Sequence, residues 1–223
     1  MKVILPLLAA CALMLSARAE NYELQTFDKI VLSEQFFSEG ANFGDFNKDG
    51  KMDIVAGPYW YAGPDFKEKK EYYPAKPFDK GAYSENFFAF TYDFNGDGWT
   101  DILIYGFPGK DAAWYENPQN KDGAWARHKI LDVVDNESPQ FEDITGDGKP
   151  EIICNSGGFL GYAEADWTDA KKPWTWTSVT PKGGWQRFTH GLGIGDVDGD
   201  GKKDLMDASG WWKQPSDLKS TEP

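Results

Sequence analysis

An acidic nine-residue loop occurs four times in this chain and limits its possible folds more than any other feature. Each copy has oxygen-bearing side chains at positions 1, 3, 5 and 9 and glycine at position 6. The copies are Asp45–Asp53, Asp93–Asp101, Asp143–Glu151 and Asp196–Asp204. Ca²⁺ is a hard cation that takes closely spaced oxygen ligands, and glycine permits the positive φ that wraps a chain around an ion. The repetition in one frame therefore predicts calcium-binding loops in preference to solvated acidic turns.

The flanks of these loops indicate strands and exclude the helical EF-hand. An EF-hand needs a bidentate Glu at position 12 of its loop, and no copy has one. A short apolar run that soon reaches a glycine follows each loop, such as Ile54–Ala56 and Ile102–Ile104. Such runs are typical of buried strands. Each loop is therefore expected to join two strands.

The loop belongs to a longer repeat, because its first residue falls at 45, 93, 143 and 196. Periods of about fifty residues with several short strands each are typical of β-propellers. In each repeat a strand such as Ala41–Gly44 precedes the loop, and apolar, aromatic and outer strands follow it. The expected aromatic strands are Tyr59–Tyr61, Trp114–Glu116, Gly161–Ala163 and Trp211–Lys213, and the clearest outer strands are Trp125–Leu131 and Trp174–Val179. The sequence predicts an all-β fold, a β-propeller of four-stranded blades with four repeats present.

One expected outer strand, Phe27–Leu32, lies ahead of the first loop. A propeller hides the edges of its sheets by closing into a ring. Phe27–Leu32 could pair with Trp211–Gln214 and close a four-bladed ring, or it could belong to a blade that this sequence lacks.

The loop motif, together with Phe43-Gly44 before the first copy and Ala56-Gly57-Pro58 after its strand, resembles the FG-GAP/VCBS repeat family. That family includes the propellers of integrin α-subunits and many secreted bacterial proteins. The resemblance covers residues 27–215 and implies a β-propeller, usually seven-bladed, with a divalent cation in several blades. Because this chain has four repeats, we expect part of a longer seven-bladed propeller in preference to a four-bladed ring.

The resemblance also implies which side chains bind calcium. The implied ligands are Asp45, Asn47, Asp49 and Asp53 in the first loop, Asp93, Asn95, Asp97 and Asp101 in the second, and Asp196, Asp198, Asp200 and Asp204 in the fourth. The third loop keeps Asp143 and Asp147 but departs from the pattern with Thr145 at position 3 and Glu151 at position 9. We expect a weaker or empty site there. Calcium in such loops is expected to be structural, because it neutralises carboxylates and fixes the turn between two strands.

Residues 1–19 have the pattern of a secretory signal peptide. Lys2 precedes an apolar run from Val3 to Leu15, and Ala17-Arg18-Ala19 is a small-x-small cleavage site. The run is too short for a membrane span, and no later stretch is apolar enough to cross a bilayer. We expect residues 20–223 to form the mature domain in the periplasm or outside the cell. Leu8–Cys11 resembles a lipoprotein cleavage box, and lipid anchoring is the less favoured alternative.

The charge and cysteine content of the mature chain restrict its partners. Its net charge of −13 becomes about −15 without Lys2 and Arg18, and nucleic-acid binding needs clustered Lys and Arg. The mixed stretch Lys67–Glu71 is most simply a solvated loop. Only Cys154 remains after cleavage, so an intramolecular disulfide is excluded. Stability must therefore come from the core and the ions.

Three polar residues are candidates for function at the opposite end of the repeats. Glu39, Phe87, Glu137 and His190 each stand six residues before the first Asp of a loop. Equivalent strand positions would bring Glu39, Glu137 and His190 towards a common channel, where they could hold a metal or do acid–base chemistry. The alternative is a hydrated channel lining. His190 is the better histidine candidate, because His128 lies in an outer strand with no nearby partner signal.

Two classes of function remain open. The first is a secreted binding or scaffold module for an extracellular protein or glycan, in which some of the ten Trp residues could stack on sugars. The second is a carbohydrate-active enzyme with a metal-assisted site on the face of its propeller, as in sugar dehydratases whose repeats resemble those of this chain. No nucleophile elbow, zinc-protease motif or phosphate loop is present. Convergence of Glu39, Glu137 and His190 would favour the enzyme, and their separation would favour the module.

Overall fold

The computed structural model describes residues 26–218 and separates two compact units, Met1–Val31 and Leu32–Pro223. The signal peptide predicted at residues 1–19 lies outside the described residues. The prediction of a strand at Phe27–Leu32 is wrong, because no strand forms there and Phe27 is 91% exposed. Ile30 and Val31 are exposed as well. A strand needs a neighbour for its backbone hydrogen bonds, and no described strand pairs with this stretch.

The second unit is built from β-strands. They are β1 (Ala41–Gly44), β2 (Asp53–Ala56), β3 (Tyr59–Tyr61), β4 (Lys69–Glu71), β5 (Phe88–Tyr92), β6 (Asp101–Tyr105), β7 (Lys110–Glu116), β8 (Ala126–Glu142), β9 (Glu151–Ser156), β10 (Phe159–Glu164), β11 (Thr175–Ser178), β12 (Gly193–Gly195), β13 (Asp204–Asp207) and β14 (Gly210–Trp212). Residues 26–218 contain no helix, and so none that could span a membrane. The predicted all-β class is confirmed.

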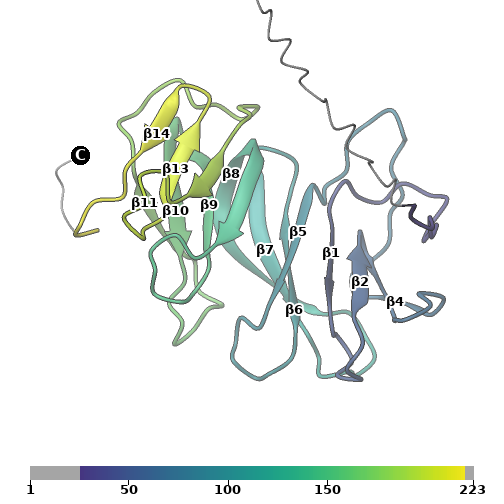
Figure 1. Ribbon diagram of the computed structural model, residues 1–223. Coiled ribbons are helices and arrows are strands. Elements are labelled where there is room, and N and C mark those ends of the chain that lie inside the picture. The colour runs from purple at the N-terminus through teal and green to yellow at the C-terminus, as the bar shows by residue number, and fades with distance from the viewer. Residues whose placement is uncertain (1–25, 219–223) are drawn as a thin grey trace, which may run out of the picture. The chain divides into compact units, whose positions relative to one another are not determined.

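The strands form antiparallel sheets of four, seven and three members (Figure 1). The four-stranded sheet has the order β1-β2-β3-β4, and the three-stranded sheet has the order β12-β13-β14. In the seven-stranded sheet, the 17-residue strand β8 pairs with β7 through its first part and with β9 through its second. Its register shifts between Asp135 and Gln140. The seven-stranded sheet therefore consists of two four-stranded units that share β8. The predicted strand order is confirmed in the first three repeats, and the described residues of the fourth repeat form three strands.

The expectation of a solvated loop at Lys67–Glu71 is wrong, because its last three residues form β4 beside β3. Lys69 Nζ lies 4.2 Å from the centre of the Tyr59 ring, and Lys70 Nζ lies 5.3 Å from that of Trp60. Long lysine stems cover apolar surface while their charges stay in water. Lysines are also common on exposed sheet edges, so the mixed charge of this stretch suits an edge strand.

Aromatic side chains of the loops and strands build the core. Phe46 and Phe94, at position 2 of the first two loops, are each 1% exposed. Phe46 packs with Trp60 and Trp125, and Phe94 stacks on Trp114 at a centroid distance of 5.3 Å. Burial of such rings is the main favourable term in packing a domain of this kind. The core thereby attaches the start of each of these acidic loops to its sheet.

Candidate metal-binding loops

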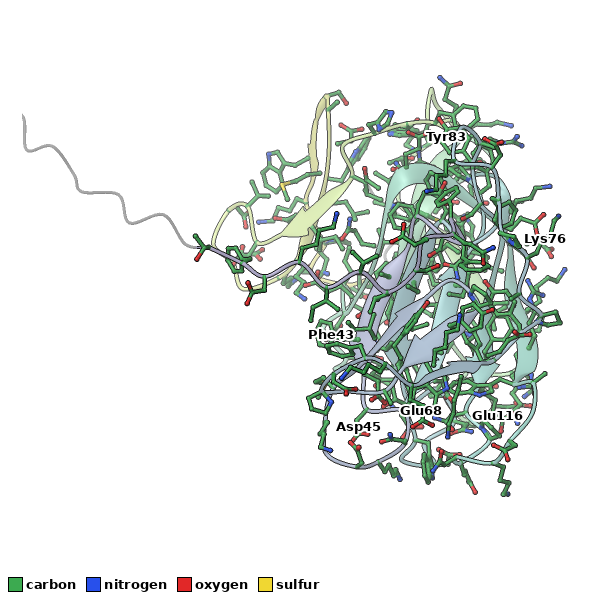
Figure 2. The ribbon with its side chains drawn as sticks, turned by 90° about the vertical axis from the view of Figure 1, so that its right-hand side faces the viewer. Phe43, Asp45, Glu68, Lys76, Tyr83 and Glu116 are labelled. Atoms are coloured by element: carbon green, nitrogen blue, oxygen red, sulfur yellow. The ribbon has the colours of Figure 1, made fainter. Side chains whose placement is uncertain are left out.

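The four acidic loops occupy equivalent places in the sheets. They connect β1 to β2, β5 to β6, β8 to β9 and β12 to β13. Figure 2 shows Asp45 of the first loop and Glu116 at the end of β7 on one side, far from Tyr83. The loops therefore mark one end of the strands.

Each loop is wound around the carboxylate of its first residue. In the second loop, Asp93 accepts hydrogen bonds from the backbone N–H groups of Asp97 at 3.1 Å and Gly98 at 2.8 Å. Asp45 and Asp196 make the same pair of contacts in their loops. Gly98 has φ +81° with nothing within 4 Å of a Cβ placed there except Lys48 Nζ. Position 6 therefore requires glycine for its backbone angle, as the sequence predicted.

Two of the loops gather three carboxylates closely enough to hold a metal ion. In these sets, one oxygen of each residue lies within 4.8 Å of the others. The sets are Asp143, Asp147 and Glu151 in the third loop and Asp196, Asp198 and Asp204 in the fourth. The donors are all oxygen atoms, which hard cations prefer. In the third loop the longer Glu151 reaches the other two carboxylates from position 9.

In the first, second and fourth loops, the position 9 carboxylate also closes the loop on its sheet, a role that sequence reasoning missed. Asp101 is fully buried; its Oδ2 accepts from Phe94 N at 3.0 Å and its Oδ1 from Asn117 N at 2.7 Å. The equivalent pairs are Phe46 N and Gly63 N on Asp53, and Val197 N and Gln214 N on Asp204. In each of these loops, one carboxylate thus links the start of the loop to the segment that follows the third strand of the same four-stranded or three-stranded unit. The residue that donates the second hydrogen bond lies ten to sixteen residues after the carboxylate, and no sequence motif marks its position.

Burial makes the carboxylates of Asp101 and Glu151 costly to ionise. Burial, together with the nearby charges of Asp97 and Asp93, raises the pKa of Asp101 to about 7. Burial likewise raises the pKa of Glu151 to about 7, with Asp147 and Asp143 adding to the effect. A cation beside several carboxylates favours their charged forms. The electrostatics of the loops therefore suit a bound cation.

A lysine already neutralises part of the fourth loop. Lys213, just after β14, has its Nζ 3.0 Å from Asp200 Oδ2 and also contacts Asp198 Oδ2. Nothing in the spacing of the repeat indicates this contact. The fourth loop thus has an internal positive charge next to two of its expected ligands.

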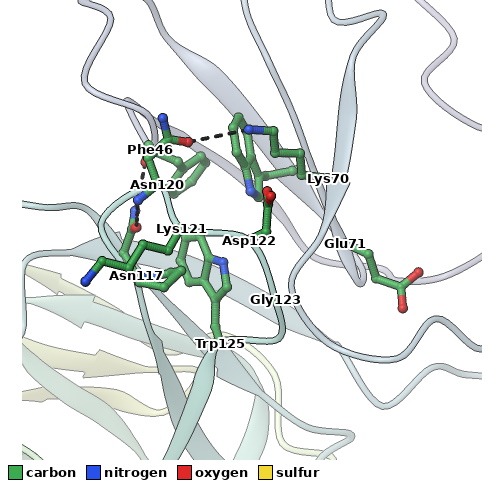
Figure 3. Close-up of a pocket in the computed structure, with 11 residues that line it drawn as sticks. Phe46, Lys70, Glu71, Asn117, Asn120, Lys121, Asp122, Gly123 and Trp125 are labelled. Atoms are coloured by element: carbon green, nitrogen blue, oxygen red, sulfur yellow. Dashed lines mark hydrogen bonds between the residues drawn. The ribbon is translucent and has the colours of Figure 1, made fainter.

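Asn117 connects the first two loops (Figure 3). Its side chain donates to the carbonyl oxygen of Phe46 at 2.9 Å and of Thr100 at 3.0 Å. Asn117 is 2% exposed and lines a cavity of about 210 Å³ with Trp60 and Trp125. The two loops are therefore held together through a buried amide.

Of the three candidate residues at the end opposite the acidic loops, only two contact each other. His190 Nε2 lies 3.0 Å from Glu137 Oε2, so the expected approach of these two residues is confirmed. Glu39 instead accepts a hydrogen bond from Ser84 N at 3.1 Å and contacts the Ser84 hydroxyl. Among the described residues, Glu39, Glu137 and His190 do not form a set with ligand atoms within 4.8 Å. The three candidates therefore do not converge as a shared metal site would require, because Glu39 is held by Ser84 instead.

His128 does have partners, contrary to the sequence interpretation. Its Nε2 lies 2.8 Å from Glu116 Oε2, and its ring lies 4.5 Å from that of Trp114. Glu116 also contacts Lys171 at 2.7 Å and Asn95 at 3.2 Å. Although burial opposes it, these contacts lower the pKa of Glu116. His128 is part of a network that supports the second loop.

Comparison with known protein families finds a match for one of the repeats of this chain. Residues 93–154 match the family model of the FG-GAP-like repeat. The matched stretch runs from the second acidic loop to β9, and so covers one whole period. The chain carries an FG-GAP-like repeat, and the resemblance drawn from its loop motif is confirmed there. Searches of curated proteins and of solved structures each found no match.

Proposed function

We propose that this chain is a secreted, calcium-binding β-propeller module that binds an extracellular protein or glycan. The observation that carries the proposal is the recurrence of one acidic loop at four equivalent strand connections, with carboxylates gathered in the third and fourth. A module of this kind uses the loops to stabilise its sheets and leaves other surfaces for a partner.

Calcium is the cation that fits the donor set best. Asp, Asn, Thr and Glu oxygens at positions 1, 3, 5 and 9 would hold it, and neither histidine nor cysteine takes part. Ca²⁺ accepts six to eight oxygen ligands in flexible geometry, whereas Mg²⁺ keeps several waters and demands an octahedron. When bound, the ion would offset the repulsion between carboxylates in each loop.

A propeller arrangement agrees with the repeated four-stranded unit and with the FG-GAP-like repeat. Units that share β8 follow one another directly, and β1 contacts β5 of the next unit. Stacked units of this type bury their faces against each other. Secretion is supported by the signal-peptide pattern of residues 1–19.

A binding role is favoured over metal chemistry at the opposite end. Glu39 contacts Ser84, while Glu137 and His190 contact each other. Two side chains do not provide the three protein ligands that a catalytic zinc site uses. Separation of the three candidates therefore supports the module.

Thermal unfolding in calcium and in EGTA tests the calcium part of the proposal. An ion that binds only the native state raises stability by RT ln(1 + [L]/Kd) per site, so EGTA should lower the melting temperature clearly. Asp97→Ala should remove part of that response, whereas Asp122→Ala, in an exposed loop, should not. An unchanged melting temperature after chelation with EGTA would contradict the calcium proposal.

The location and partner need separate measurements. Expression of residues 1–223 should give a product cut after Ala19 outside the cytoplasm, as mass spectrometry would show. The mature protein should then retain glycans on an array or capture a surface protein in the presence of calcium. An uncut cytoplasmic product, or the absence of any partner, would contradict the corresponding part of the proposal.

A further inference from the structure

A second cavity of about 400 Å³ is lined by residues of the seven-stranded sheet and of the segment that precedes it. The segment between β4 and β5 forms one side of it, and β6, β7 and β8 form the other. Figure 2 shows Lys76, which lines this cavity, well separated from Asp45 and Glu116. The volume is within the usual range of small-molecule sites, about 300–1,000 Å³.

The inner wall of the cavity is aromatic and apolar. The rings of Tyr73 and Tyr115 are stacked, with centroids 5.3 Å apart and an interplanar angle of 25°. Ala113 is 2% exposed and presents only a methyl group beside them. Such a wall suits the apolar C–H surface of a ligand.

The polar groups at the rim carry both signs of charge. Arg127 Nη2 lies 2.6 Å from Asp111 Oδ2, and this pair largely neutralises itself. Glu85 and Lys110 line the cavity without an ion pair between described residues. A purely anionic ligand would meet Glu85 and Asp111, and a purely cationic one would meet Lys110 and Arg127.

One hydroxyl inside the cavity is poised to donate. Tyr73 Oη accepts a hydrogen bond from Asn86 Nδ2 at 3.2 Å. Burial raises the pKa of Tyr73 to about 12, so the hydroxyl keeps its proton at neutral pH. That proton has no acceptor among the described residues.

We propose that this cavity binds a short neutral saccharide of one or two sugar units, an inference that rests on the proposed binding function and names its ligand class. A sugar hydroxyl donates and accepts at once, so it can use Glu85 as an acceptor and Lys110 as a donor. The sugar ring has apolar C–H faces for the tyrosine wall. Hydrogen bonds to charged groups are the stronger ones, so both rim groups add to the affinity for a sugar hydroxyl.

Isothermal titration of the calcium-loaded mature protein tests this inference with maltose, cellobiose, xylobiose, lactose and chitobiose, and with digalacturonate as the acidic comparison. At least one neutral disaccharide should bind. Glu85→Gln combined with Lys110→Gln should weaken that binding by about ten-fold or more. Both side chains are exposed and unpaired, so the variant should fold.

The matched control is Lys121→Gln combined with Asp122→Asn, which changes the same chemistry at the rim of the 210 Å³ cavity. It should leave binding unchanged. Loss of binding in the control alone, or retained binding in the Glu85 and Lys110 variant, would overturn the cavity inference while leaving glycan binding intact. Binding of digalacturonate alone would contradict a neutral ligand. Absence of any saccharide binding would overturn the inference, and the proposed module function would then rest on capture of a protein partner.

Discussion

The side-chain amide of Asn117 donates a 2.9 Å hydrogen bond to the backbone carbonyl of Phe46, which lies 71 residues earlier in the chain. The backbone N–H of the same asparagine donates to Asp101. Asn117 therefore couples position 2 of the first loop to position 9 of the second. The stability of one loop is linked in this way to the placement of the other.

Asn117→Ala should destabilise the protein by about 2–4 kcal/mol, because it leaves the buried carbonyls of Phe46 and Thr100 without donors. Urea unfolding followed by tryptophan fluorescence measures the change. Asp122→Ala is the control, since Asp122 is exposed in the same connection and its loss should cost far less. Equal effects of the two substitutions would show that the bridge contributes nothing.

Positions 5 and 9 of the second loop should respond differently to calcium. Asp97 is exposed, whereas Asp101 is fully buried and accepts two backbone hydrogen bonds. Asp101→Ala should therefore lower the free energy of unfolding by about 2–4 kcal/mol even in EGTA. Asp97→Ala should act mainly in calcium.

Chemical unfolding of both variants, with and without EGTA, separates these roles. A loss for Asp101→Ala that vanishes in EGTA would mean that position 9 acts only through the ion. Asp101→Asn is a useful intermediate, because it keeps one oxygen acceptor but turns the other into a donor that faces an N–H group.

Sequence reasoning found the parts of the fold that depend on local chemistry. Glycine at position 6, as at Gly98, follows from the backbone angle that the turn demands. Short apolar runs such as Ile102–Ile104 follow from burial on both faces of a sheet. These signals lie within a few residues of each other, so a single sequence displays them.

Contacts between distant segments could not be read in the same way. The hydrogen bond from Asn117 to Asp101 depends on where β7 ends, and the hydrogen bond from Ser84 to Glu39 spans 45 residues. Phe27–Leu32 has strand-forming residues, yet no strand within residues 26–218 supplies the backbone hydrogen bonds that a strand needs. In each case the deciding partner is set by tertiary structure.

Lys213 should compete with a cation at the fourth loop. Its ammonium group lies against Asp198 and Asp200, and these carboxylates raise its pKa. Lys213→Met removes that internal charge while keeping a long side chain, so the fourth loop should bind calcium more tightly.

Calcium titration would measure the gain in affinity, in a protein whose other three loops are disabled by changing Asp45, Asp93 and Asp143 to Ala. Lys171→Met, at an exposed lysine outside the fourth loop, provides the control, and equal affinities for all variants would contradict the competition.

The two histidines should differ in their effect on stability, although each faces a glutamate. The His128 side chain is 19% exposed and packs on Trp114, whereas that of His190 is 71% exposed. His128→Ala should cost about 1–3 kcal/mol, because it removes ring packing and a partly buried contact to Glu116. His190→Ala should cost less than about 1 kcal/mol, since contacts between exposed polar side chains contribute little. Thermal unfolding of both variants at pH 7 measures the difference, and His128→Asn tests whether a smaller polar side chain restores the contact to Glu116. A large loss for His190→Ala would instead make the His190–Glu137 pair a structural element of its end of the sheets.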